Sequence, residues 1–289
     1  MKDTQKETAY RECERLTKIW STGYSLAIKM FPPDVADATY ALYAFARTAD
    51  NIVDAPSPDR EALMARQREW RLAWESGRST DPVLFATADV FRAYDIPFEY
   101  SEQFFASMEM DTHISRYDTY ADLEQYMDGS AGAVGAMMAH VIGFSDPAAL
   151  PYARALGHAL QLTNFLRDIR EDYEVFGRIY IPEADLYRYG VEEKDIRDHS
   201  HGMAFRYLMH AYVTKNRALY KEARAGIPFL YPRGRAAVSL AASIYERVLS
   251  EIERRDYDVF SSRVSVPSWK KGILALSAAA SAGLGQLSF

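Results

Sequence analysis

Apolar residues recur along this chain every three or four positions, and strand-like alternation of polar and apolar residues is nearly absent. Such spacing is typical of amphipathic α-helices, in which every third or fourth side chain shares a face. Proline, glycine and small polar residues interrupt the pattern, as in Ala55-Pro56-Ser57-Pro58 and Gly226-Ile227-Pro228. The pattern predicts helices over about residues 5–29, 34–53, 59–76, 83–94, 100–110, 119–141, 147–174, 203–224, 233–255 and 267–281.

The predicted helices form one continuous series, because no linker, low-complexity tract or repeat divides them. A chain of 289 residues is long enough for one large domain or two ordinary ones. Hydrophobic residues make up 48% of it, enough for a substantial core, and charged residues make up 26%, which argues against disorder. We predict one all-α domain over residues 1–289.

The charge and cysteine content exclude several classes of protein. A net charge of -6 disfavours a nonspecific nucleic-acid binder, so we expect no nucleic-acid partner. The single Cys13 excludes an internal disulfide or a cysteine-based zinc site and fits a reducing cytoplasm. The sequence shows neither a signal peptide nor a membrane-spanning run. We expect a cytoplasmic protein, and Lys270 and Lys271 leave peripheral membrane contact open. Nothing indicates its oligomeric state.

Two acidic clusters lie far apart in the chain, each on a predicted helix. Each places oxygen-bearing side chains three or four residues apart: Asp50 and Asp54 in the first, and Gln161, Asn164, Asp168 and Asp172 in the second. Residues four apart differ by only about 40° around a helix, so each cluster projects from one face. Both lie within apolar sequence that should face a core, where like charges repel strongly. We therefore expect a cation between them.

Magnesium fits such a site, because it takes one or two carboxylates together with water and phosphate oxygens. We predict Mg²⁺, with Mn²⁺ as an alternative, and a diphosphate bound across it. The metal would neutralise the diphosphate and make it a better leaving group, and Asn164 fits as a neutral ligand. The alternative is that the acids form solvated faces or salt bridges with nearby arginines. Two clusters within apolar helices favour the metal site.

Arginines near the clusters could hold the phosphates. Arg47 shares a face with Asp50, Arg178 lies just after the second cluster, and Arg263 follows a predicted helix end. One guanidinium group can donate hydrogen bonds to two phosphate oxygens at once. Residues 176–182 interrupt the helical pattern, and we interpret them as a flexible loop that closes over a bound anion. The alternative is an ordinary connection between helices.

A third segment, residues 126–138, carries Gly129, Gly132 and Gly135. Glycine within a helix costs about 1 kcal/mol relative to alanine, so a compensating need is expected. Close helix packing is one explanation, and room for a long apolar substrate beside a local kink is the other. In the second case Tyr126 would point its ring into the reaction chamber, where aromatic faces stabilise cations.

These motifs together resemble the bacterial squalene/phytoene synthase family, from about Leu16 to Lys271. The resemblance rests on Leu42–Arg47 with Asp50–Asp54, Ala131–Gly135, Gln161–Asp168 with Gly177–Pro182, and Tyr245–Phe260 with Arg263-Val264. It implies a single-domain isoprenoid synthase fold, a helical bundle with a central cavity. It also implies a Mg²⁺-dependent prenyltransferase that joins two prenyl diphosphates head to head.

The resemblance implies a role for each candidate residue. The metal ligands would be Asp50, Asp54, Asn164, Asp168 and Asp172, and Tyr126 would join the four aspartates as catalytic residues. Substrate binding would fall to Tyr24, Arg47, Tyr126, Gln161, Arg178, Tyr245 and Arg263. The chain departs from the family at Trp20, where a polar residue is common, at Gly23, where serine is common, and at Asn51, where a second aspartate is common. The first two changes put one diphosphate subsite in doubt.

The implied reaction starts with ionisation of one substrate to an allylic cation. The double bond of the second substrate attacks that cation, and the cyclopropyl diphosphate so formed ionises again and rearranges. Proton loss gives phytoene, whereas hydride from NADPH gives squalene. We favour two geranylgeranyl diphosphates going to phytoene through prephytoene diphosphate, in carotenoid biosynthesis, and expect no need for NADPH. The alternatives are a C30 enzyme that uses farnesyl diphosphate to make dehydrosqualene, squalene or presqualene diphosphate, and a non-catalytic helical binding scaffold.

Overall fold

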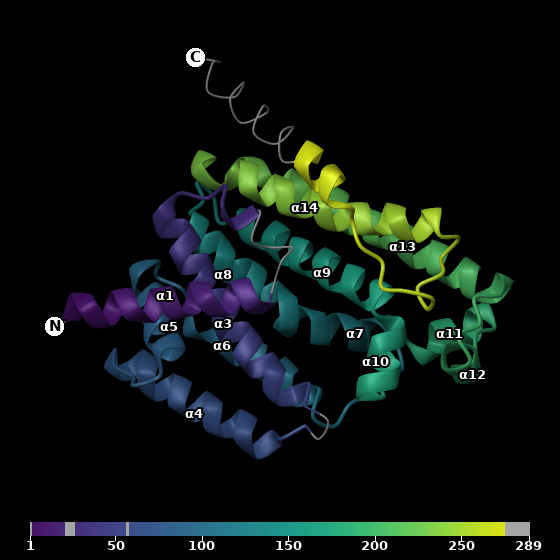
Figure 1. Ribbon diagram of the computed structural model, residues 1–289, viewed down its shortest axis with the longest axis horizontal. Helices are drawn as coiled ribbons and strands as arrows, with labels where there is room; N and C mark the ends of the chain where they lie inside the picture. Colours follow the sequence, from purple (N-terminus) through teal and green to yellow (C-terminus); the bar gives the residue numbers. More distant parts are fainter. Residues whose placement is uncertain (1, 21–26, 56–57, 275–289) are drawn as a thin grey trace, which may run out of the picture.

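The computed structural model describes residues 2–20, 27–55 and 58–274. Within these ranges the protein is built from helices, and the only strand-like pairing is an isolated bridge between Phe144 and Leu230. Figure 1 shows α9 in the middle of the molecule, with α13 and α14 on one side of it and α3, α6 and α4 on the other. The predicted all-α fold is confirmed.

The described helices follow the chain in this order: α1 (Lys2–Trp20), α3 (Pro33–Val53), α4 (Arg60–Ser76), α5 (Pro82–Ala93), α6 (Phe98–Met110), α7 (Tyr120–Met127), the π-helical η1 (Asp128–Gly132), α8 (Ala133–Ile142), α9 (Ala149–Arg167), α10 (Ile169–Phe176), α11 (Glu183–Tyr189), α12 (Glu193–Arg197), α13 (Met203–Ala225), the 3₁₀ turn η2 (Ile227–Phe229) and α14 (Pro232–Arg254). In the parts of the chain covered here, every helix is too short or too polar to cross a bilayer.

Polar side chains fix several helix starts. Asp59 accepts a hydrogen bond from the backbone N–H of Ala62 at the start of α4, and Asp81 caps α5 in the same way. Thr119 and Asp122 form a reciprocal capping box at the start of α7. Each cap satisfies backbone donors that the first helical turn leaves unpaired.

The predicted helices differ from the observed ones mainly by interruptions. The segment predicted over 119–141 passes through the π-helical turn η1, and the one over 147–174 breaks at Asp168 between α9 and α10. The short helices α11 and α12 were not predicted, because they span too few residues for a periodic pattern to emerge. Residues 21–26 and 275–281 of two predicted helices lie outside the described ranges.

The glycine-rich segment packs closely against its neighbours. A Cβ on Gly135 would lie 2.3 Å from the carbonyl oxygen of Ala153, and one on Gly129 would lie 2.3 Å from that of Gln103. From the other side, a Cβ on Gly157 would lie 2.2 Å from the carbonyl oxygen of Ala131. Close packing therefore explains these glycines, and the π-helical turn η1 interrupts the helix at this segment.

Candidate active site

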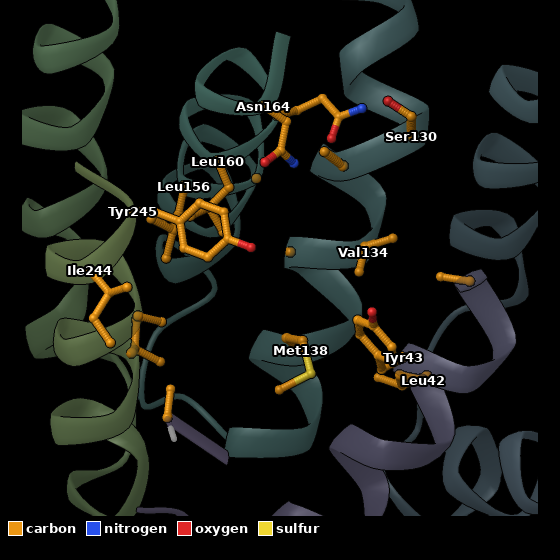
Figure 2. A pocket seen from close by; sticks show the side chains of 18 of the residues that line it. Leu42, Tyr43, Ser130, Val134, Met138, Leu156, Leu160, Asn164, Ile244 and Tyr245 are labelled. Atoms are coloured by element: carbon orange, nitrogen blue, oxygen red, sulfur yellow. The ribbon is translucent and has the colours of Figure 1, made fainter. Parts of the chain in front are cut away.

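A cavity of about 800 Å³ runs through the middle of the bundle. Its walls come from α3, η1, α8, α9 and α14, and Figure 2 shows side chains from opposite walls pointing into it, among them Leu42, Val134, Leu160 and Tyr245. Most of the lining is apolar or small. One end is polar and carries Arg47, Asp50, Asp54, Gln161, Asn164, Arg167, Asp168, Glu171, Asp172 and Arg263. The predicted central cavity is present.

The fold brings the two acidic clusters to that one end. Asp50 lies in the last turn of α3, and Asp54 follows directly as the residue that ends the helix. Asp168 occupies the break between α9 and α10, and Asp172 lies one turn further on. All four line the same cavity, and Asp54 contributes to the raised pKa of Asp172, so the structure brings the two clusters together.

The environment of Asp50 disfavours a negative charge. Burial, and then the neighbouring Asp54, raise the pKa of Asp50 to about 7, although Arg47 opposes the shift. The Arg47 Nη1 atom lies 3.9 Å from Asp50 Oδ2. About a third of the Asp50 side chain, 35%, is exposed, and the residue lines the cavity. A cation bound beside Asp50 would therefore favour its ionised form, because the positive charge would offset the effects of burial and of Asp54.

The second cluster shows the same crowding. Burial, and then Asp168, raise the pKa of Asp172 well above its usual range. Asp168 itself is held by two guanidinium groups: Arg167 donates to both carboxylate oxygens, and Arg263 donates to them over 3.1 and 3.0 Å. Arg263 also lies 3.6 Å from Glu171. Arginines thus balance part of the negative charge at this end of the cavity.

Arg178 does not lie where the sequence analysis expected it. Its side chain is only 5% exposed and lies behind Asp54, outside the cavity lining. It donates to Asp54 Oδ1 over 3.0 Å and to the carbonyl oxygens of Val53 and Asp111 over 2.8 and 3.1 Å. The expectation of a flexible loop over 176–182 was wrong, because residues 178–181 are buried in the core.

Asp111 was missed by the sequence analysis. It is 6% exposed, burial raises its pKa to about 6, and it accepts hydrogen bonds from Tyr126 over 2.6 Å and from Tyr180 over 3.3 Å. Tyr126 therefore lines the cavity with its ring while its hydroxyl group is held away from it. A lone aspartate at the end of α6 carries no local signal of this network.

The other predicted site residues divide into two groups. Arg47, Gln161, Asn164, Tyr245 and Arg263 line the cavity. Tyr24 and Gly23 lie outside the described residues, whereas Trp20 is described and lines the cavity. The buried Oδ1 atom of Asn164 has no hydrogen-bond partner, so an acceptor oxygen remains available next to the acids.

Comparisons with known proteins agree on one family. The family described as squalene/phytoene synthase matches residues 20–270. The phytoene synthase of Arthrospira platensis is 32% identical and covers 92% of this chain and 91% of its own length. The phytoene synthase of Thermus thermophilus is 34% identical and covers 93% and 91%.

Solved structures give the same result for the fold. A dehydrosqualene synthase crystallised with a ligand superposes with a TM-score of 0.90, at 28% identity, over 96% of this chain and 97% of its own. The squalene synthase HpnC from Alicyclobacillus acidocaldarius superposes with a TM-score of 0.81, at 28% identity, over 88% and 97%.

Proposed function

The chain belongs to the squalene/phytoene synthase family, whose members join two prenyl diphosphates head to head, and on this premise we propose that it converts two geranylgeranyl diphosphates to phytoene with Mg²⁺. The observation that carries this proposal is the shape and polarity of the cavity. Acids and arginines gather at one end, and a long apolar interior follows. A diphosphate with a long hydrocarbon tail has the same two parts.

The acidic end fits magnesium. Carboxylates from two helices, two of them with a raised pKa, and the unpaired Asn164 Oδ1 supply oxygen ligands. Among the described residues no three or more His, Cys, Asp or Glu side chains surround a single point. We propose that Asp50, Asp54, Asn164, Asp168 and Asp172 hold magnesium jointly with diphosphate oxygens and water, which fill the remaining positions. Bound magnesium would neutralise the departing diphosphate.

The residues of the chain would then perform separate tasks. Arg47, Arg167 and Arg263, all at the polar end, would bind phosphate oxygens. The apolar walls would exclude water from the allylic cation while C1 of one substrate bonds to the double bond of the other. Two diphosphates and two protons leave in total. No histidine lines the cavity in the described part of the chain, so we propose the released diphosphate as the base.

The second candidate is formation of a C30 product from farnesyl diphosphate. It is favoured by the structural neighbours, which are described as a dehydrosqualene synthase and a squalene synthase. The relatives from Arthrospira platensis, Synechocystis and Thermus thermophilus are phytoene synthases, which favours the C40 product.

Product analysis separates these candidates. Purified protein given Mg²⁺ and geranylgeranyl diphosphate, without NADPH, should form a C40 hydrocarbon and release two diphosphates per product. A parallel reaction receives farnesyl diphosphate, and a third receives EDTA, which should stop turnover. Asp168→Asn should sharply reduce diphosphate release, whereas the exposed Asp118→Asn should not. Turnover of farnesyl diphosphate but not of geranylgeranyl diphosphate would favour the C30 enzyme. Turnover of neither substrate would favour the non-catalytic helical binding scaffold.

We also propose that the protein works in the cytoplasm at a membrane surface, where an insoluble product can leave. Trp269 and Ile273 are 65% and 57% exposed and lie one helical turn apart, next to Lys271, whereas Lys270 is paired with Glu251. Exposed apolar side chains beside a lysine suit an anionic lipid surface. Flotation with anionic vesicles tests this, and Trp269→Ser together with Ile273→Ser should reduce the bound fraction. Equal flotation of both proteins would contradict it.

A further inference from the structure

Helix α9 gives the cavity a length scale. Lining residues recur along this helix from the polar end to its first turn: Asn164, Gln161, Leu160, Gly157, Leu156, Ala153, Tyr152 and Ala149. At about 1.5 Å per residue, the path from Asn164 to Ala149 is about 22 Å long. Asn164 lies one turn before the acids, so this path starts close to where the first carbon of a bound chain would lie.

A prenyl chain can be measured against this path. An extended isoprene unit contributes four bonds of about 1.5 Å, which project to about 5 Å. Three units therefore span about 15 Å and four span about 20 Å, measured from the same start. A farnesyl chain would end near Ala153, whereas a geranylgeranyl chain would extend into the first turn of α9, to within about 2 Å of Ala149. The two substrates differ only in what fills the last turn of the path.

The residues around that last turn are called the floor layer here. They are Met138, Ala139, Ile142, Ala149, Tyr152, Gly226, Ile227, Leu230 and Ala237, and all of them line the cavity. Four of the nine are alanine or glycine, so the layer has side chains that leave space. Figure 2 shows Met138 and Val134 on one wall, one turn apart, both pointing into the cavity.

Contacts among η2, the start of α14 and the segment between α8 and α9 hold the floor layer in place. The backbone N–H of Ser145 donates to the carbonyl oxygen of Phe229, and that of Tyr231 donates to Gly143, each over 2.9 Å. The ring of Tyr152 stacks on Phe229 at 5.8 Å and 13°. Gly226 lies so close that an added Cβ would be 2.1 Å from the Cβ of Tyr152. A chain longer than the path would therefore meet closely packed side chains and backbone.

We propose that the floor layer receives the fourth isoprene unit of a geranylgeranyl chain, and that Ala149 and Ala237 are specificity-determining residues for chain length. The proposal rests on the proposed function and refines its substrate. Ala149 begins α9, and Ala237 lies three residues after Gly234, whose added Cβ would be 2.4 Å from Ile142. Both alanines are therefore at the deep end, where a larger side chain would take the space of the fourth unit and leave the first three.

The test is a competition between two substrates. Wild-type protein and Ala237→Leu receive equal amounts of farnesyl and geranylgeranyl diphosphate with Mg²⁺, and the ratio of C40 to C30 product is measured. We expect the ratio to fall about tenfold or more, because added carbons in a filled pocket discriminate at that scale. The matched control is Ala236→Leu, on the same helix but outside the cavity lining, which should keep the ratio within about twofold.

A second pair guards against misfolding of the first. Ala149→Leu should lower the ratio in the same way, and the exposed Ala148→Leu should not. Circular dichroism establishes which variants fold. If wild-type protein makes C40 product and the folded Leu variants keep its ratio, or lose both products alike, the assignment of the floor layer is refuted while the proposed function stands. If wild-type protein makes only C30 product, the proposed function fails as well.

Discussion

Replacing Asp50 with asparagine should stabilise the protein in the absence of metal, and only at higher pH. The pKa of Asp50 rises from 3.8 to about 7, mainly through burial. Because the folded-state pKa lies above the unfolded one, the stability that this carboxyl contributes is complete at low pH. It is lost progressively as the pH rises from about 4 through about 7. Asparagine carries no charge and escapes this loss.

The magnitude follows from the same pKa. Each pKa unit corresponds to about 1.4 kcal/mol, so an unscreened charge would cost about 4 kcal/mol above pH 8. The Asp50 side chain is 35% exposed, so solvent screens the charge, and part of the loss has already occurred at pH 5. We therefore expect the advantage of Asp50→Asn in the free energy of unfolding to grow by about 1–2 kcal/mol between pH 5 and pH 8.5.

The assay is urea denaturation in EDTA at both pH values, for wild-type protein, Asp50→Asn and the exposed control Asp118→Asn. The control should change the free energy of unfolding by less than about 0.5 kcal/mol at either pH. Asp50→Asn should also lose the stabilisation that Mg²⁺ with inorganic diphosphate gives the wild type, and this loss would connect the carboxyl to metal binding. An advantage that is independent of pH, or that shrinks as the pH rises, would refute the electrostatic reasoning.

Two further predictions concern charges outside the cavity lining. Arg178→Gln should lower the free energy of unfolding by about 3–5 kcal/mol in urea denaturation, because it leaves Asp54 and Asp111 without their buried cation. The control is the exposed Arg68→Gln, and equal effects of the two substitutions would contradict this prediction. Glu251→Gln should cost about 2–3 kcal/mol at pH 7, because a hydrogen bond from Lys270 and further basic partners hold the pKa of the buried Glu251 at about 2. This cost should shrink as the pH falls below about 4, and an equal cost at pH 3 and pH 7 would argue against the ion pair.

Periodicity was enough to predict most helices, because an amphipathic helix repeats its apolar face over several turns. The interval of four between Asp50 and Asp54, and between Asp168 and Asp172, likewise predicts acids that share a face. Local pattern did not reveal the break at Asp168, because its backbone N–H still donates to Asn164 as in a helix. It also did not reveal α11 and α12, which are too short for a face to repeat.

Contacts between distant segments decided the rest. Arg178 is buried because Val53, Asp54 and Asp111, which belong to other parts of the chain, offer oxygens to its guanidinium group. Asp111 joins the site only because α6 ends beside Tyr126 and Tyr180. The depth of the cavity likewise depends on where η2 meets the start of α9. Spacing along one helix determines which side chains share a face, but only packing determines what that face meets, since the partners come from remote positions.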